Sequence, residues 1–179
     1  GDIVECGVFK GVGLFLWLKF LKIYLSNSNK RVVGFDMFSH FPKNIEKYEK
    51  KTAKRYVSDS MFKGTSIKNL MKMASTFIEE EKLELIKGDI TRTAKSYVKK
   101  NKGFKISLLH LDLDTYKGTK KSLEAFYPKM SKGGLIVLDE YGARGWGETD
   151  AVDEFLQDKK LQISTVENAY SPTAVIQMK

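Results

Sequence analysis

Short apolar runs alternate with stretches of helical spacing along most of the chain. Five of these runs have the length and composition of strands, and they cover residues 2–5, 31–36, 83–87, 106–112 and 135–139. Because strands separated by helices return in the same direction, this alternation predicts an α/β fold with a mostly parallel, doubly wound sheet. The fourth and fifth runs are almost continuously apolar, which is typical of central strands covered on both faces.

The pattern changes beyond residue 140. Residues 151–158 have helical spacing, and residues 161–166 and 173–178 resemble two further strands. We expect these two strands to form an antiparallel hairpin at the edge of the parallel sheet. The chain has 179 residues, 42% of them hydrophobic, without a break in composition, which predicts a single domain over residues 1–179.

Residues 41–76 are the least regular part of the chain. Lysine-rich helical patches occur around residues 44–56, and a looser stretch follows them. We interpret residues 41–76 as an insertion between the second and third strands. Ligands of doubly wound sheets bind at the carboxyl ends of the strands, where such an insertion would form a lid. A pair of solvated surface helices explains the same pattern equally well.

Residues 12–25 are strongly apolar, but they are too short to span a bilayer and are interrupted by Lys19 and Lys22. They predict a buried helix. A signal peptide would have a basic region before this run and a small-residue cleavage site after it, and neither is present. Since the sequence opens without methionine and almost inside a strand, we expect further residues upstream, including a segment that covers this helix.

The formal net charge is +9, from 31 cationic and 22 acidic residues. Only four of the cationic residues are arginine, the usual reader of bases, and the lysines are spread along the whole chain. This distribution favours a solvated lysine surface over a nucleic-acid partner, and the charge would still suit an acidic substrate. The single cysteine, Cys6, excludes an internal disulfide or a multi-cysteine zinc site and is compatible with the cytoplasm. We interpret it as a small packing residue.

A glycine-rich segment, Glu5-Cys-Gly-Val-Phe-Lys-Gly-Val-Gly13, joins the first strand to the first helix. Its glycines would let the backbone pass close to a nucleotide-like ligand, and Glu5 could accept a hydrogen bond from a cationic group or a hydroxyl. The dinucleotide fingerprint is Gly-x-Gly-x-x-Gly, whereas this turn contains the bulky Phe9 and Lys10. The order therefore favours S-adenosylmethionine over NAD. An NAD-linked oxidoreductase is the alternative, and it predicts NADH binding.

The next two strands also end in aspartates. Asp36 follows Gly11 by 25 positions, where an acid commonly accepts the ribose hydroxyls, although it could instead cap the following segment. Asp89 would lie near the adenine amino group with Ile90 on the ring face, or it could cap the helix predicted at residues 91–99. The expected cofactor residues are Glu5, Cys6, Gly7, Val8, Gly11, Asp36, Met37, Gly88, Asp89, Ile90 and Asp112.

Three acids close the fourth and fifth strands: Asp112, Asp139 and Glu140. Like charges held together repel, so such a cluster needs a cation, a raised pKa or water. Magnesium is the simplest answer, since hard oxygen ligands suit it and it would lower the pKa of a bound hydroxyl.

Two residues are candidates for the proton acceptor. Asp112 would face both cofactor and metal, but a metal-bound carboxylate is a weak base, and the lid residue His40 is the alternative. We interpret His110 as a core histidine with satisfied partners, and Asp114 as a cap for the helix predicted at residues 117–127.

Six segments together resemble the macrocin O-methyltransferase family, a branch of the class I S-adenosylmethionine enzymes that includes the mycinamicin and novobiocin sugar methyltransferases. They occur in the family's order over nearly the whole chain: residues 1–11, 35–38 with Pro42, 111–116, 127–134, 138–142 and 151–155. The resemblance implies a Rossmann-like seven-stranded sheet, S-adenosylmethionine as methyl donor, a magnesium site and, for the best known members, a sugar hydroxyl as acceptor.

The motif match implies that Glu5, Gly7 and Asp36 bind the cofactor and that Asp112, Asp139 and Glu140 bind the metal. Two departures concern the acceptor end: the family usually has two aspartates where this chain has Asp139-Glu140, and His40 replaces a small residue. The leading hypothesis is a magnesium-dependent O-methyltransferase acting on a sugar, glycan-like or natural-product hydroxyl. A non-catalytic cofactor-binding domain is the alternative outside the enzymes, and a homo-oligomer is compatible with either.

Overall fold

A computed structural model describes residues 1–59 and 64–179 of the chain. Within these residues seven strands form one sheet in the order β3-β2-β1-β4-β5-β7-β6. Strands β1 to β5 pair in parallel, whereas β7 is antiparallel to both β5 and β6. The predicted α/β sheet with a C-terminal antiparallel hairpin is therefore confirmed. The strands are β1 Asp2–Cys6, β2 Val32–Asp36, β3 Leu83–Lys87, β4 Ile106–Leu111, β5 Met130–Leu138, β6 Ile163–Thr165 and β7 Ala174–Gln177.

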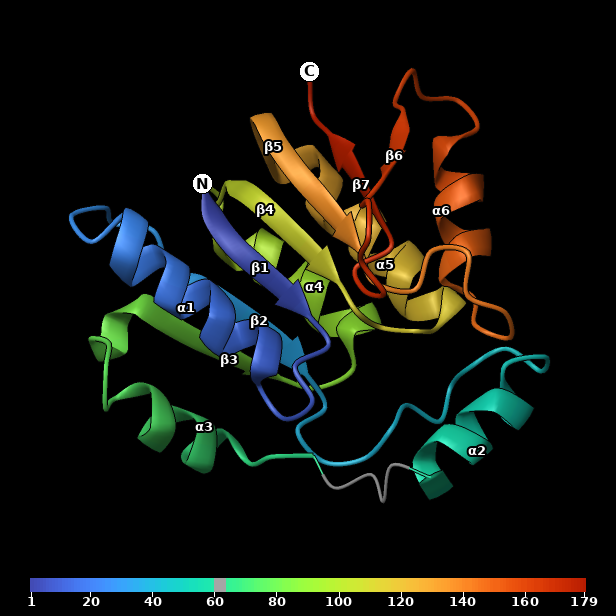
Figure 1. Cartoon of the computed structure of the whole chain (residues 1–179), viewed down its shortest axis with the longest axis horizontal. Coiled ribbons are helices and arrows are strands. Elements are labelled where there is room, and N and C mark those ends of the chain that lie inside the picture. The colour runs from blue at the N-terminus through green and yellow to red at the C-terminus, as the bar shows by residue number, and fades with distance from the viewer. Residues whose placement is uncertain (60–63) are drawn as a thin grey trace.

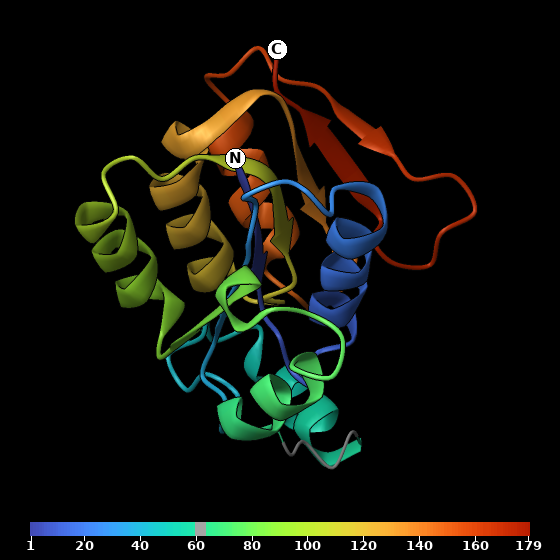
Figure 2. The ribbon, with the colours of Figure 1, turned by 90° about the vertical axis from the view of Figure 1, so that its left-hand side faces the viewer.

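Helices cover both faces of the sheet (Figure 2). Helices α1 and α3 pack on one face and α4, α5 and α6 on the other, while α2 lies beyond the carboxyl ends of the parallel strands (Figure 1). The described helices are α1 Val12–Tyr24, α2 Lys50–Asp59, α3 Ile67–Ala74, α4 Ile90–Lys100, α5 Tyr116–Phe126 and α6 Glu148–Leu156, with short 3-10 helices at Glu80–Lys82 and Tyr127–Lys129.

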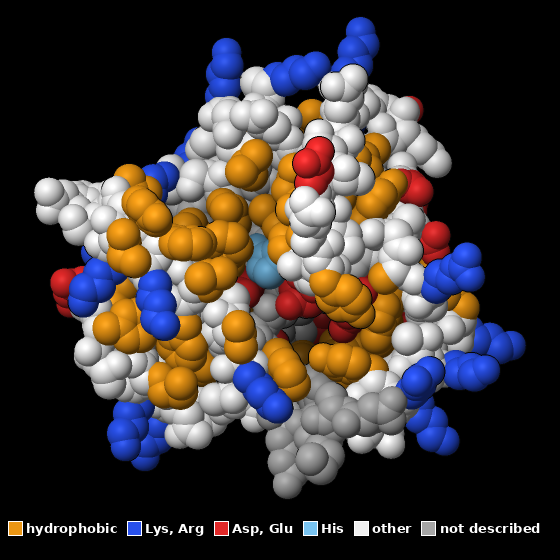
Figure 3. Space-filling view, in the orientation of Figure 1, with side chains coloured by type: hydrophobic (Ala, Val, Ile, Leu, Met, Phe, Trp, Pro, Cys, Tyr) orange, Lys and Arg blue, Asp and Glu red, His pale blue; other side chains and the backbone are white. Residues whose placement is uncertain are grey.

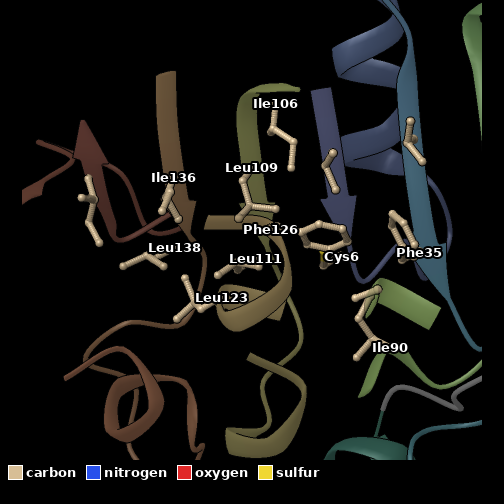
Figure 4. Close-up of a cluster of buried hydrophobic side chains, with 14 of the residues drawn as sticks. Cys6, Phe35, Ile90, Ile106, Leu109, Leu111, Leu123, Phe126, Ile136 and Leu138 are labelled. Carbon is tan, nitrogen blue, oxygen red and sulfur yellow. The ribbon is translucent and has the colours of Figure 1, made fainter. Parts of the chain in front are cut away.

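The larger core lies between the sheet and helices α4, α5 and α6 (Figure 4). The ring of Phe35 on β2 lies 5.2 Å from that of Phe126 on α5 and 5.3 Å from that of Tyr97 on α4. Phe35 and Phe126 are fully buried. Because burying a phenylalanine contributes about 1.5–3 kcal/mol, these contacts hold the ends of the central strands rigidly.

The smaller core joins α1 and α3 to the opposite face. It contains Leu14 and Leu18 of α1 and Leu70 of α3, all fully buried. The outer side of α1 is different, since Val12 is 80% exposed and Ile23 68% exposed. Residues 12–25 thus form the predicted helix, but only one of its sides is buried. No helix within the described residues combines the length and apolar character that crossing a membrane would require.

The segment predicted as an insertion divides into two parts. Helix α3 packs on the sheet through Leu70 and Ala74 and so connects β2 to β3 along its face. Residues 41–59 instead extend past the carboxyl ends of the strands (Figure 1). Residues 60–63, which the same prediction included, lie outside the described residues. The interpretation of this segment as a lid stays a prediction.

Candidate active site

The glycine turn brings the ends of β1 and β4 into direct contact. Gly7 has a φ of 93°, and a Cβ atom there would lie only 1.7 Å from the carbonyl oxygen of Asp112. The amide of Asp112 donates a 2.8 Å hydrogen bond to the carbonyl of Cys6. Gly11, with a φ of 86°, is the N-cap of α1. Gly7 is therefore required both by its backbone conformation and by the lack of space.

Asp36 holds this turn in shape. Its Oδ2 accepts hydrogen bonds from the amides of Val8 at 2.8 Å and Phe9 at 3.0 Å, and its Oδ1 accepts from the amide of Phe38 at 2.6 Å. A carboxylate offers about four acceptor positions, so these three bonds leave room for one more. Asp36 also lines the adjoining pocket, where that position is available to a ligand hydroxyl.

One pocket connects the ends of β1, β2, β3 and β4. It encloses about 840 Å³ of space, part of it open to solvent. The predicted site residues on its wall are Gly7, Asp36, Met37, His40, Gly88, Asp89, Ile90 and Asp112. Further lining residues that the sequence did not suggest include Phe9, Phe41, Tyr56, Thr115, Lys117 and Gly118.

The other predicted cofactor residues lie beneath this wall. The side chain of Cys6 is fully buried in the larger core, as a packing residue should be, and that of Val8 is buried in the smaller one. Glu5 is also buried, and its Oε1 lies 2.1 Å from the position of a Cβ atom on Gly13. These side chains support the turn, and any contact of Cys6 or Val8 with a ligand in the pocket would involve their backbone atoms.

Asp89 adopts the capping role that was one of its two interpretations. It is the N-cap of α4, and its Oδ1 accepts from the amide of Thr91 at 2.9 Å and from the Thr91 hydroxyl at 2.7 Å. The preceding Gly88 donates its amide to the carbonyl of Asp36 at 2.9 Å. Because Asp89 also lines the pocket, capping and ligand binding are compatible at this position.

His110 links the glycine turn to the acids at the end of β5. Its Nδ1 lies 3.4 Å from Oε1 of Glu5, and its Nε2 lies 3.5 Å from Oδ1 of Asp139. These are ion-pair distances without well-formed hydrogen bonds. Burial lowers the pKa of His110, but the carboxylates of Asp139 and Glu5 outweigh it and raise the pKa to about 10. The two acids therefore favour the cationic form of this buried imidazole, a role beyond that of the core histidine predicted.

The acids at the ends of β4 and β5 lie side by side. Leu111 pairs with Leu138 across these strands, and Asp112 and Asp139 are the residues that follow. Burial and the charge of Asp139 raise the pKa of Asp112 to about 7, and the same two causes raise the pKa of Glu140. Figure 3 shows acidic side chains gathered in a hollow beside a histidine, with hydrophobic side chains around it.

The oxygen atoms of these acids are suitable ligands for a hard cation, but the side chains are not arranged around one point. Carboxylate oxygens are the ligands that magnesium prefers, and the raised pKa values of Asp112 and Glu140 reflect negative charge that His110 does not balance. Among residues 1–59 and 64–179, however, no three His, Cys, Asp or Glu side chains are arranged as a ligand set. The donor set therefore fits magnesium, while the described side chains do not converge on one point.

The buried Glu148 is a fourth acid beside this group, and nothing in the sequence singled it out. Its Oε1 accepts the amide of Glu140 at 3.0 Å, whereas its Oε2 has no hydrogen-bond partner within the described part of the chain. Burial first, and then the charges of Asp112 and other nearby acids, raise its pKa well above the usual value. Glu148 thereby fixes the backbone of the turn that carries Asp139 and Glu140.

The predicted capping role of Asp114 is wrong. The N-cap of α5 is Thr115, which makes no capping bond with its side chain. The first amide of the helix, that of Tyr116, instead donates to Oε1 of Glu49 at 2.7 Å, and Oε2 of Glu49 accepts the amide of Glu46 at 2.6 Å. Glu49 is fully buried. A carboxylate from residues 41–59 thus caps a helix that lies far away in sequence.

We expect Glu49→Gln to loosen residues 41–59 without unfolding the domain. Glutamine has one acceptor oxygen, so it can satisfy only one of the two amides, and the loss of one such bond costs about 1–3 kcal/mol. Hydrogen exchange should accelerate at Glu46 and Tyr116 and stay unchanged in β4. The matched control is Glu46→Gln, because the side chain of Glu46 makes a half-exposed ion pair with Lys117 at 3.3 Å and caps no helix among the described residues. Equal exchange in both variants would contradict this role of Glu49.

Comparisons with known proteins agree with the fold and the motifs. The family model of macrocin-O-methyltransferase (TylF) matches residues 1–169. The structure of CalS11, a calicheamicin methyltransferase, is similar over 99% of this chain and 72% of its own, with 25% identity and a TM-score of 0.78.

Two more distant structures share the fold. The O-methyltransferase NovP is 21% identical, with a TM-score of 0.79 over 100% of this chain and 72% of its own. The methyltransferase PaMTH1 from Podospora anserina, solved with S-adenosylhomocysteine, is 13% identical, with a TM-score of 0.64 over 99% and 71%. A search of curated protein sequences finds no match. The family match over most of the chain decides the assignment: the chain belongs to the macrocin O-methyltransferase (TylF) family of S-adenosylmethionine-dependent O-methyltransferases.

Proposed function

We propose that the protein methylates a hydroxyl group of a sugar or glycan-like natural product and that magnesium assists it. The observation that carries this proposal is the position of Asp112, which lies at the wall of the pocket beside the glycine turn and also within the acid cluster. A donor bound at the turn and an acceptor hydroxyl bound at the acids would therefore meet at one residue. CalS11 is described as a TDP-rhamnose 3'-O-methyltransferase, which supports a sugar acceptor.

The donor side of the pocket suits S-adenosylmethionine, which supplies an electrophilic methyl group when bound. Gly7 admits a ligand close to the backbone, and the remaining acceptor position of Asp36 is suited to a ribose hydroxyl. Asp89 and Ile90 offer a polar and an apolar contact to the base, since both line the same pocket. In this proposal Phe9 and Met37 complete the apolar wall.

The acceptor side is the acid cluster. Asp112, Asp139 and Glu140 would hold magnesium, which would polarise the acceptor hydroxyl when bound. The hydroxyl oxygen attacks the methyl carbon in line, the new C–O bond forms as the C–S bond breaks, and S-adenosylhomocysteine leaves. The protein contributes mainly by positioning the two reactants, which can supply about 7–11 kcal/mol of the barrier.

The hydroxyl proton passes to Asp112 or to His40. The Nδ1 of His40 lies 3.0 Å from the carbonyl oxygen of Phe41. A carbonyl only accepts, so Nδ1 carries the proton in this bond and the neutral ring keeps a lone pair on Nε2. His40 lines the pocket and is exposed, which makes it the better base whenever Asp112 is bound to a cation.

Turnover with defined acceptors tests the proposal. The protein is incubated with methyl-labelled S-adenosylmethionine and a panel of glycosides and sugar-free hydroxyl compounds, once with magnesium and once with EDTA, and products are identified by mass spectrometry. We expect a product that carries one labelled methyl group in place of a hydroxyl hydrogen, and that forms with magnesium and not with EDTA. Equal turnover in EDTA would contradict the role of magnesium. Methylation confined to acceptors without a sugar would contradict the assignment of a sugar acceptor.

A further inference from the structure

Three aromatic rings meet between α2 and the turn that precedes α6. The centroids of Phe41 and Tyr56 are 6.1 Å apart, and the ring of Trp146 lies 5.9 Å from Phe41 and 5.8 Å from Tyr56. All three side chains are half-buried. We refer to Phe41, Tyr56 and Trp146 as the aromatic trio.

The backbone around the trio fixes its position independently of the rings. A Cβ atom on Gly145, whose φ is 86°, would lie 2.5 Å from Oγ1 of Thr52 on α2. On the neighbouring side, Gly147 donates its amide to the carbonyl of Asp114 at 2.9 Å. Trp146 is therefore placed between two glycines that each pack closely on other elements. Replacing one ring should leave this backbone arrangement intact.

Two rings of the trio lie next to the carboxylates of the candidate site. Phe41 and Tyr56 line the same pocket as Asp112 and Asp114, whereas Trp146 does not line it and packs against both of these rings. Burial and the negative charges of Asp114 and Asp112 raise the pKa of Tyr56 to about 12. This end of the pocket thus has two chemically different parts, one aromatic and one acidic.

We propose that Phe41 and Tyr56, positioned by Trp146, bind a planar aglycone of the acceptor, while the acids bind the sugar hydroxyl that is methylated. This inference rests on the proposed function, because it assigns a class of acceptor to the same pocket. Aromatic rings bind planar groups by stacking or by edge-to-face contact, and carboxylates select hydroxyls. A simple monosaccharide would contact only the acidic part. A glycoside with an aryl group or a nucleobase would contact both.

Binding of three rhamnosides tests this proposal. Methyl rhamnoside, p-nitrophenyl rhamnoside and TDP-rhamnose are titrated into protein that is already saturated with S-adenosylhomocysteine and contains magnesium. We expect at least one of the two planar aglycones to bind roughly tenfold more tightly than methyl rhamnoside, as one good stacking contact allows. The stronger of the two identifies whether the planar group is an aryl aglycone or a nucleobase.

Variants distinguish recognition of the planar aglycone by the aromatic rings from a general effect on packing. Trp146→Leu keeps an apolar side chain but removes the ring that positions Phe41 and Tyr56, and it should abolish the preference while changing the affinity for methyl rhamnoside less than twofold. Trp146→Phe should restore most of the preference. Tyr170→Leu is the control, since Tyr170 is 99% exposed.

Equal affinity for all three rhamnosides, or a preference that survives in Trp146→Leu, would overturn the role of the trio and leave the proposed function standing. Failure of all three to bind to the S-adenosylhomocysteine complex would overturn the role of the trio and also count against the sugar acceptor. A preference lost in Trp146→Leu but not in Tyr170→Leu is the result that supports the proposal.

Discussion

Replacing Asp139 by asparagine is expected to lower kcat by about 10²–10³ and to remove its dependence on magnesium, while the affinity for S-adenosylhomocysteine stays within a few-fold of the wild-type value. Asp139 follows β5 and does not line the pocket proposed for the donor, so in the proposed function its charge acts on the acceptor side. The substitution keeps the size of the side chain and removes its charge. Kinetics with and without magnesium and calorimetry of the product complex measure the two effects.

A second measurement distinguishes two roles of Asp139, that of a metal ligand and that of a partner of His110. Manganese binding, followed by electron paramagnetic resonance, should be lost in Asp139→Asn and retained in Asp158→Asn, which makes the same change on an exposed aspartate. Retained manganese binding together with reduced turnover would mean that Asp139 acts through its 3.5 Å contact with His110 instead. Unchanged, magnesium-dependent turnover would contradict the assignment of Asp139 altogether.

Gly7→Ala is expected to have the largest effect on the donor side. The added methyl group would lie 1.7 Å from the carbonyl oxygen of Asp112, so β1 and β4 must separate at their ends. We expect the free energy of unfolding to fall by about 3 kcal/mol or more, with the loss of measurable S-adenosylhomocysteine binding. Urea unfolding and calorimetry test the two effects.

The control for this substitution is Gly133→Ala. Gly133 also has a positive φ, 74°, but a Cβ atom there would meet nothing within 4 Å. Gly133→Ala should lower the free energy of unfolding by only about 1–2 kcal/mol, the cost of a left-handed backbone conformation, and should leave the ligand affinity unchanged. If Gly7→Ala were no more destabilising than Gly133→Ala, the close approach of β1 to β4 would not be the reason for a glycine in this turn.

The sequence predicted the elements that depend on local pattern. Helix α4 differs from its prediction by a residue at each end, and β3 matches its prediction throughout. The start of β5 was missed, because Ser131, Lys132 and the two glycines that follow have the composition of a turn. In the structure Met130 pairs with Ile106 across a register irregularity, and β5 therefore begins earlier than the apolar run.

The sequence suggested candidate site residues where they follow strands, and it missed those that meet only through the tertiary fold. Asp112 and Asp139 follow paired strands, so their proximity follows from the topology alone. Glu49 lies in a lysine-rich segment and caps a helix 67 positions away, which no local pattern indicates. Glu148 has the sequence appearance of an exposed first turn, although it is fully buried. In both cases the partner is a backbone amide, which carries no sequence signature.

Calorimetric titration of S-adenosylhomocysteine into the purified protein is the most direct test of the central claim, that the pocket bounded by Gly7, Asp36 and Asp89 is the donor site. We expect binding to one site with a dissociation constant in the micromolar range, lost in Gly7→Ala and retained in Asp139→Asn. NADH, titrated in the same way, should not bind. Absence of S-adenosylhomocysteine binding to the folded wild-type protein, or binding that Gly7→Ala leaves unchanged, would contradict the assignment of this pocket.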